Sequence, residues 1–330
     1  MVPTEHFVAI ALTTLFSLLG RISQQKRLRK IIRQISQPTP GNLGAWEEAY
    51  KRWKNITVFW TKDEIAFYEN MEPFEKSRSA KRSTALPPPP KGGFVIDPSD
   101  SRNAEWQNFT GFLAALAGAS LPSNATPRNN PGENFRRSSL KETKIAQASV
   151  ERYMLDMVQL LVNEQVFVRD VVKQTLGSEL SPALYPVLFK QLIYVVSRFF
   201  DSHGEPLCTD QYTMFVDQAI SVLKLVLDRM SSPADAIFSV DFGLLVLYFA
   251  RYLHRLGHSL NGLRVKIKMC QLCETLMQKK EYISLRQEIR LRNKMVEVMI
   301  EWTSDFSLVS TFVLSSLVRV ASSGSNSHKY

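Results

Sequence analysis

Two pairs of side chains in the C-terminal half of this 330-residue chain have the spacing of metal ligands. Cys270 and Cys273 form a C-x-x-C pair, and His254 and His258 lie one helical turn apart just upstream. Thiolates and imidazoles are the ligands of tetrahedral zinc sites, so these four residues are the metal candidates. Both pairs, however, lie in apolar segments with helical spacing, and their order is the reverse of a zinc finger. Cysteines three residues apart on a helix often line a hydrophobic core, and we favour that interpretation.

Motifs of nucleotide binding and hydrolysis are absent from the sequence. It contains no GxxxxGK[ST], GxGxxG, GxSxG or HExxH segment. Acidic side chains lie mostly beside basic ones at helical spacing, as Glu297 and Glu301 do near Lys294. This arrangement is typical of solvated helix faces. We therefore expect this chain to have no catalytic residues, no cofactor and no enzymatic activity of its own.

Positive charge is the strongest bias in the composition. Lys and Arg number 41 against 31 Asp and Glu, which gives a formal net charge of +10. The excess is concentrated at 21–33, 76–82 and 136–144, with a second basic zone over 264–294. No nucleic-acid-binding motif accompanies these segments, so we expect no nucleic-acid partner, and an anionic membrane or an acidic protein surface fits them equally well. The candidate patch for a membrane or a partner comprises Lys26, Arg27, Arg29, Lys30 and Arg33.

An apolar run from Phe7 to Leu19 precedes this patch. The run is shorter than the about 20 residues that span a bilayer, and no basic residue stands before it as in a signal peptide. Two interpretations of this region involve a membrane. One is a short signal anchor, and the other is a basic amphipathic anchor over residues 7–33 that lies on a membrane surface. We favour a buried helix followed by a solvated basic helix. Three cysteines are too few for a disulfide framework, so we expect a cytoplasmic protein, with membrane association as the alternative.

Two neighbouring serines match the target of a basophilic kinase. Ser138 and Ser139 directly follow Arg136 and Arg137, in a stretch rich in Pro, Asn, Arg and Ser that predicts a loop. A phosphate there would reverse the local charge and order the loop against a basic neighbour. Ser138 and Ser139 are therefore the candidate phosphorylation sites.

The spacing of apolar residues predicts helices almost throughout the chain and no sustained strand. One buried helix face is predicted by residues at helical spacing, namely Trp46, Tyr50, Trp53 and Ile56. Proline runs and polar gaps separate the helical segments. We expect N-terminal helices with the basic segment over 1–72, a proline-rich linker over 73–103, a short packed helix over 104–121, a polar loop over 122–143, a helical-repeat region over 144–308 and an atypical tail over 309–330.

Glycine, serine and proline mark the helix ends within 144–308. Gly177 fits a position just after a helix, and Ser181 before Pro182 fits an N-cap. The breaks delimit helices over 144–163, 166–176, 182–200, 209–230, 234–256, 262–280 and 283–304. Long helices joined by short turns predict an all-α fold, a HEAT- or armadillo-like α-solenoid of antiparallel helices with Pro-rich and polar loops. A compact helical bundle is the alternative, because no repeat consensus is visible.

Short motifs stand in a fixed order along residues 21–308. They are Ala45-Trp-Glu-Glu48, Glu105-Trp-Gln-Asn-Phe-Thr-Gly-Phe-Leu113, Glu179-Leu-Ser-Pro-Ala-Leu-Tyr-Pro186, Phe199-Phe-Asp-Ser202, Ile267-Lys-Met-Cys-Gln-Leu272 and Arg292-Asn-Lys-Met-Val-Glu297. With the basic stretch from Arg21 to Gln37, they resemble the neurofibromin and fungal Ira-like Ras GTPase-activating proteins, in the region just upstream of the catalytic domain.

The resemblance implies a part of a very large cytosolic negative regulator of Ras. In this family a central domain supplies an arginine finger, and flanking helical-repeat arms mediate dimerisation and positioning. The implied partners are a Ras-type small GTPase, through the adjacent domain, and the helical arms of a second copy. The chain lacks the Phe-Leu-Arg finger motif and the Asn-Pro-Ala signature, so no catalytic arginine is carried over. Residues 309–330 do not resemble the family, and we expect the family's chain to continue past Leu308.

Overall fold

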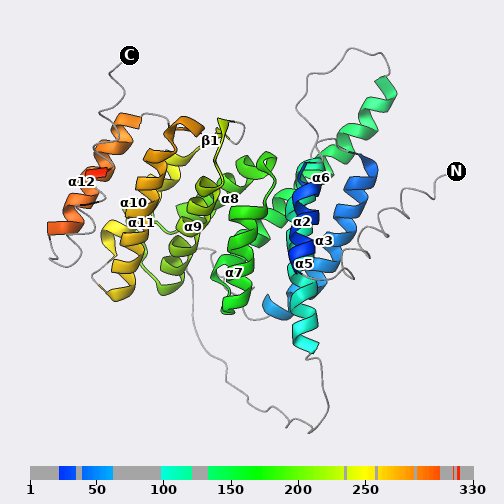
Figure 1. The fold of residues 1–330 in the computed structure, drawn as a ribbon, viewed down its shortest axis with the longest axis horizontal. Helices are drawn as coiled ribbons and strands as arrows, with labels where there is room; N and C mark the ends of the chain where they lie inside the picture. Colours follow the sequence, from blue (N-terminus) through cyan, green and yellow to red (C-terminus); the bar gives the residue numbers. More distant parts are fainter. Residues whose placement is uncertain are drawn as a thin grey trace, which may run out of the picture.

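Helices make up most of the described chain, and two short parallel strands accompany them (Figure 1). The computed structural model describes residues 22–34, 39–61, 98–120, 133–233, 236–256, 259–285 and 288–304, together with 315, 318 and 319. The helices are α2 (Ile22–Ile32), α3 (Pro40–Thr61), α5 (Pro98–Ser120), α6 (Glu133–Gln159), α7 (Val166–Gln174), α8 (Tyr185–Ser197), α9 (Asp210–Asp228), α10 (Phe242–Arg255), α11 (Leu260–Gln278) and α12 (Glu288–Ser304). The predicted helical class is therefore confirmed.

Short turns and strands join these helices. The turns are η1 (Leu160–Val162), η2 (Thr175–Glu179), η3 (Pro182–Leu184) and η5 (Lys280–Tyr282), and η2 is a π-helical turn. The strands are β1 (Ile237–Asp241) and β2 (Ile283–Ser284).

From α6 onward the chain alternates between two layers of helices. One layer contains α6, α8, α10 and α12, in which each helix contacts the next, and the other contains α7, α9 and α11. The helices α10 and α12 run in the same direction, because their starts meet at Gly243 and Leu291 and their ends meet at His254 and Glu301. At the other end of the described chain, α5 packs against α2, α3 and η2. The helices thus follow one another from α3 and α5 to α12 (Figure 1).

The core at the N-terminal end is a cluster of aromatic rings from α3, α5 and α6. Trp46, Tyr50 and Trp53 are at most 9% exposed and Ile56 is partly buried against the core, which confirms the predicted buried face of α3; Trp106 of α5 is also fully buried. Trp53 Nε1 donates a hydrogen bond to Thr110 Oγ1 at 2.8 Å, and the Tyr153 hydroxyl donates to the Thr110 carbonyl at 3.0 Å. Because leaving a buried indole N–H without an acceptor is costly, these bonds help to fix how the rings pack.

The strands correct two predicted helix starts. Residues 237–241 and 283–284 were expected to be helical, but β1 and β2 pair in parallel, with Ile237 opposite Ile283. The side chains of Ile237, Val240 and Ile283 are buried. Strands this short show too few alternations for a periodicity to reveal them, and their partners are far apart in the sequence.

Two predicted gaps also contain helix. α5 begins at Pro98, so the linker prediction is wrong for 98–103, and α6 begins at Glu133, so the loop prediction is wrong for 133–143. Proline is well accommodated at the first position of a helix, where its missing N–H has no partner to lose. The opening turns of both helices are polar, and polar composition is the same signal that predicts a gap. Residues 73–97 and 122–132 of the predicted gaps lie outside the described part of the chain, as do residues 62–72 of the predicted N-terminal helices.

Gly177 does not end a helix as predicted. It lies buried inside the π-helical turn η2, against α9. A Cβ atom added at Gly177 would lie 2.5 Å from the Cβ of Leu225. The glycine is therefore required by the close approach of the Leu225 side chain to this backbone and not by a left-handed conformation.

Replacing Gly177 with alanine is expected to lower the free energy of unfolding by about 1–3 kcal/mol, because the new methyl group overpacks the contact with Leu225. Helix propensity alone predicts the opposite sign, with alanine better by up to about 1 kcal/mol. Gly41→Ala in α3 is the matched control, because a Cβ there would meet only Thr39 Oγ1, at 3.9 Å. Urea denaturation of the two variants measures the difference. Equal effects at the two sites would contradict the packing argument.

Candidate interaction surfaces

The basic helix α2 is docked on the rest of the molecule. Arg29 is 2% exposed, and its Nε lies 2.6 Å from Glu179 Oε2, while its Nη2 donates to Glu179 Oε1 at 3.1 Å. The side chain of Arg29 passes over Gly111 of α5, where a Cβ would lie 2.6 Å from it. Arg33 donates to the Ser178 carbonyl at 2.7 Å. Burial, with the cation of Arg229 as the next cause, lowers the pKa of the Arg33 guanidinium.

These contacts correct the predicted basic patch. Arg29 and Arg33 serve an internal contact, which a sequence cannot distinguish from surface charge, whereas Lys26, Arg27 and Lys30 are exposed. The apolar side chains of α2 at positions 28 and 32 pack against the core. Over residues 24–33 the described surface therefore carries the exposed cations Lys26, Arg27 and Lys30 together with an apolar side chain, Ile31, that is 60% exposed. Residues 7–21 of the anchor considered from the sequence lie outside the described chain.

The four metal candidates are not brought together by the described structure. Cys270 and Cys273 are 0% and 2% exposed on α11, which confirms their core position. His254 is about half exposed, and its Nδ1 lies 3.0 Å from Glu301 Oε2. His258 lies outside the described residues. Among the described residues, no three His, Cys, Asp or Glu side chains gather as metal ligands.

In the native chain, iodoacetamide at about pH 8 is expected to modify Cys208 and to leave Cys270 and Cys273 intact. Only the thiolate reacts, and burial raises the pKa of Cys270 to about 12 and the pKa of Cys273 well above its ordinary value. Cys208 is exposed, although desolvation also raises its pKa and slows the reaction. Peptide mass mapping before and after urea treatment checks this result. Rapid native-state labelling of either α11 cysteine would contradict it.

The candidate phosphorylation sites lie in a different setting from the one predicted. Ser138 and Ser139 fall within α6 and not in a loop. Their side chains lie outside what the structure describes. A kinase needs an extended segment at its target, so modification here would require this end of α6 to open first.

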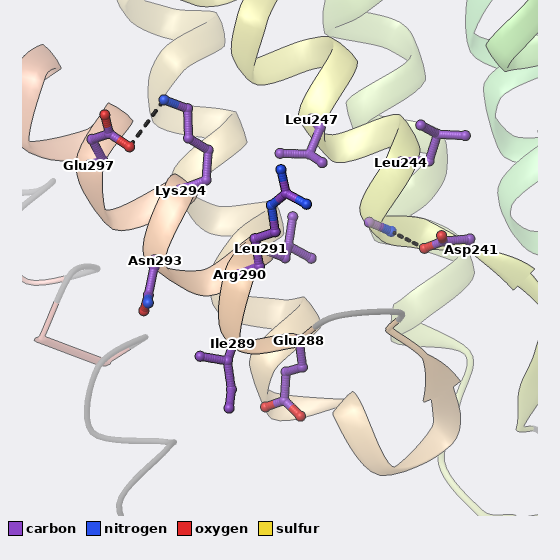
Figure 2. A pocket seen from close by; sticks show the side chains of 11 residues that line it. Asp241, Leu244, Leu247, Glu288, Ile289, Arg290, Leu291, Asn293, Lys294 and Glu297 are labelled. Atoms are coloured by element: carbon purple, nitrogen blue, oxygen red, sulfur yellow. Dashed lines mark hydrogen bonds and ion pairs between the residues drawn. The ribbon is translucent and has the colours of Figure 1, made fainter.

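A groove of about 1350 Å³ runs between α10 and α12 (Figure 2). Leu244 and Leu247 form its apolar wall on α10, and they are 44% and 39% exposed. α12 contributes Arg290, Lys294 and Glu297 to the opposite wall. An apolar wall that faces charged side chains is suited to binding another helix or segment.

Local contacts at the start of α10 fix one end of this groove. Asp241 is the N-cap of α10, and its Oδ1 accepts a hydrogen bond from the Gly243 N–H at 2.9 Å. A Cβ on Gly243 would lie 3.2 Å from a methyl group of Leu291, so glycine lets α12 approach closely. The spacing of Lys294 and Glu297 predicted only a solvated helix face, so that spacing does not reveal the groove. The sequence does contain a signal for the groove. Leu244 and Leu247 are apolar, yet they lie on the face of α10 opposite the one that supplies its buried apolar residues.

A smaller hollow of about 340 Å³ lies over α7, α9 and α11. Each helix contributes one lysine, namely Lys173, Lys224 and Lys268. Lys268 Nζ lies 2.6 Å from Asp217 Oδ1, and Lys173 Nζ lies 2.6 Å from Asp170 Oδ1. Much of this positive charge is therefore neutralised within the chain.

The predicted basic zone over 264–294 is also partly internal. Lys266 is 3% exposed, with its Nζ 5.7 Å from the centre of the Trp302 ring. Lys279 Nζ donates to the Met230 carbonyl at 2.7 Å. These lysines support packing between helices, so they are unavailable to an acidic partner.

Within the described residues, no single helix has both the length and the apolar composition needed to cross a membrane. One pair of segments, Val166–Glu179 and Pro182–Ser197, is long and apolar enough when the two are counted together, but they meet at a bend of 106°. No protein-family model matches this sequence. The described groove and the cationic face of α2 are surfaces suited to binding.

Proposed function

We propose that this chain is a helical scaffold region of a Ras GTPase-activating protein of the neurofibromin and Ira-like kind. The observation that carries the proposal is the fixed order of short motifs along residues 21–308. Several motif residues are core residues or contacts between distant elements. Trp46 and Trp106 belong to the aromatic cluster, and Glu179 receives the buried Arg29. Such positions depend on the fold, so a shared motif order favours a shared arrangement of helices.

The scaffold we propose is a HEAT- or armadillo-like solenoid. Support comes from the alternation of helices between two layers and from the parallel course of α10 and α12. In a solenoid each helical pair packs mainly on its neighbours, and equivalent helices run the same way. In a compact up-and-down bundle, neighbouring helices in one layer run antiparallel.

The proposed role is to position a catalytic domain near Ras and to associate with a second copy. The chain itself would not supply the arginine finger, since the Phe-Leu-Arg motif is absent from its sequence. The proposed location is the cytoplasm, with contact to an anionic membrane surface as a further property.

A GTPase assay with purified Ras tests the non-catalytic role. The 330-residue chain is expected to leave the intrinsic rate unchanged, because an arginine finger and its domain are worth about 10⁵-fold. Sequencing the transcript across the codons for Leu308 and Val309 tests the family assignment. A reading frame that continues into a domain with an arginine finger supports it, and a chain spanning both parts should accelerate hydrolysis. If no transcript encodes such a domain, or if this chain accelerates hydrolysis, the proposal is wrong.

A membrane-surface adaptor is the second candidate, favoured by the exposed Lys26, Arg27 and Lys30 on α2. Each basic residue near an anionic membrane contributes about 1 kcal/mol. Binding to phosphatidylserine vesicles should therefore be salt-sensitive and be lost when all three are replaced by alanine. The control variant replaces three basic residues of α3 instead, namely Lys51, Arg52 and Lys54. An equal loss of vesicle binding in both variants would show that net charge alone is responsible, and it would contradict a specific role for α2.

A further inference from the structure

Three arginine side chains from distant parts of the chain meet at the π-helical turn η2. Arg29 lies on α2, Arg33 directly follows that helix, and Arg229 is the C-cap of α9. Their partners belong to three successive residues, namely the Ser178 carbonyl for Arg33, the Glu179 carboxylate for Arg29 and the Leu180 carbonyl for Arg229. Turns of the π type are rare and are frequently found at functional sites.

Positive charge exceeds negative charge at this point. Within the described part of the chain, Glu179 supplies the one carboxylate that these three guanidinium groups contact. The helix that ends at η2 and helix α9 each add about half a negative charge through their terminal carbonyl groups, so about one positive charge is left over. Asp228, beside Arg229 in the sequence, is exposed and lines the hollow over α7, α9 and α11.

The cations of Arg33 and Arg229 lie close enough to repel each other. After burial, the charge of Arg229 is the largest cause that lowers the pKa of Arg33. Both side chains are partly exposed. Arg33 uses only Nη1, toward Ser178, and Arg229 uses only Nη1, toward Leu180 and the Tyr185 hydroxyl at 2.8 Å. A guanidinium carries five N–H donors, so both groups keep N–H donors that bond to no other described residue.

The buried Arg29 also keeps part of its guanidinium unbonded. Its Nε and Nη2 lie on the Glu179 carboxylate, but its Nη1 is buried and has no hydrogen-bond partner among the described residues. The charge of Arg29 contributes to the lowered pKa of Arg33, so it belongs to the same cluster. A buried N–H group without an acceptor is costly, and a bound anion close to it would reduce that cost.

We propose that Arg33 and Arg229, held against η2, form a binding site for a phosphate group. The planar fork of a guanidinium bonds two phosphate oxygens at once, and such charge-assisted bonds are strong. A phosphate has enough oxygens to accept from two arginines on different elements, and its charge offsets the excess of positive charge. The same chemistry is offered by a soluble phosphate ligand and by the phosphate monoester headgroup of a lipid. The inference does not rest on the family assignment.

Titration calorimetry of the full 330-residue chain with sodium phosphate tests this site. The titration is made at about pH 8, where phosphate carries close to two negative charges, with sodium chloride of equal ionic strength as the blank. Arg33→Gln and Arg229→Gln should each weaken phosphate binding at least about tenfold, because each removes charged hydrogen bonds. Arg198→Gln is the matched control and should leave the affinity unchanged, since Arg198 is likewise the C-cap of a helix, α8, but is exposed.

Two further measurements separate a lost ligand contact from a lost fold. Arg33→Lys keeps the charge but not the planar fork, so it should bind phosphate more weakly than the native chain and more tightly than Arg33→Gln. Phosphate should also slow hydrogen exchange of the α2 amides in the native chain, because the ligand connects the end of α2 to α9. This protection should be absent in Arg229→Gln. Circular dichroism of each variant confirms that it is folded.

Vesicles of phosphatidylcholine, with and without phosphatidic acid, distinguish the two sources of phosphate. Binding that requires phosphatidic acid and is lost in Arg229→Gln assigns the site to a lipid headgroup. Binding of sodium phosphate without such vesicle binding assigns it to a soluble ligand. A native chain that binds neither form would overturn the proposal. So would phosphate binding that survives both glutamine variants, or that falls equally in Arg198→Gln.

Discussion

Replacing Arg29 with alanine is expected to lower the free energy of unfolding by about 3–5 kcal/mol, because the carboxylate of Glu179 is then left without its cation in a mostly buried site. The side chains of Arg29 and Glu179 are 3% and 17% exposed. This ion pair connects α2 to η2, which lies far along the chain. Urea denaturation measures the loss, and hydrogen exchange of the α2 amides shows whether the helix detaches locally before the core unfolds.

A double-mutant cycle tests the origin of this effect. Glu179→Ala alone should also be strongly destabilising, and the double variant should cost less than the sum of the two single changes. Arg52→Ala is the matched control, because Arg52 pairs with Glu48 on the exposed surface of α3. A pair of that kind contributes about 0.3–0.5 kcal/mol. Comparable losses at Arg29 and Arg52 would show that the buried pair is not specially stabilising.

Replacing Trp53 with alanine is expected to cost about 3–5 kcal/mol, the range for removing a large ring from a packed core. Trp53 is 1% exposed, and its ring centre lies 6.4 Å from that of Trp106 and 5.4 Å from that of Tyr153. Its removal leaves a cavity between α3, α5 and α6, and Thr110 loses a donor. Urea denaturation followed by circular dichroism measures the change.

Two further variants separate the ring from its hydrogen bond. Trp53→Phe keeps an aromatic ring but removes the indole N–H, so it should cost less than Trp53→Ala. Val58→Ala lies on the same helix at a side chain that is 46% exposed, and it should change the free energy of unfolding by no more than about 0.5 kcal/mol. If the alanine variants at 53 and 58 had similar effects, the aromatic cluster would not be the source of stability.

Prediction from the sequence succeeded where the signal is local. The helical spacing that begins at Trp46 correctly placed the buried face of α3, and the predicted break between the helices 182–200 and 209–230 contains a turn at Gly204 with a positive φ of 78°. Capping was less reliable. The predicted cap Ser181 makes no side-chain capping bond, and its N–H donates instead to the Ala114 carbonyl at 3.2 Å. A side-chain cap is found instead at Thr209, whose Oγ1 accepts a hydrogen bond from the Tyr212 N–H at the start of α9.

The candidate surfaces were predicted less well than the helices, because charge by itself does not reveal its partner. Arg29 and Lys30 are adjacent basic residues on one helix, yet one is buried against Glu179 and the other is exposed. Lys294 and Glu297 were correctly expected on an exposed face, but the groove beside them requires the position of α10. The solenoid, the family and the phosphate site remain proposals for the experiments described above.

By itself the sequence determined that this chain is largely helical and where most of its helices lie, because the apolar repeat of a helix is contained within a few neighbouring residues. The tertiary structure alone decided which charges are internal, that Gly177 faces Leu225, that β1 pairs with β2, and that α10 and α12 enclose a groove. Each of these depends on residues distant in sequence. Contacts of that kind follow from how whole helices pack, and the local pattern of residue types does not specify them.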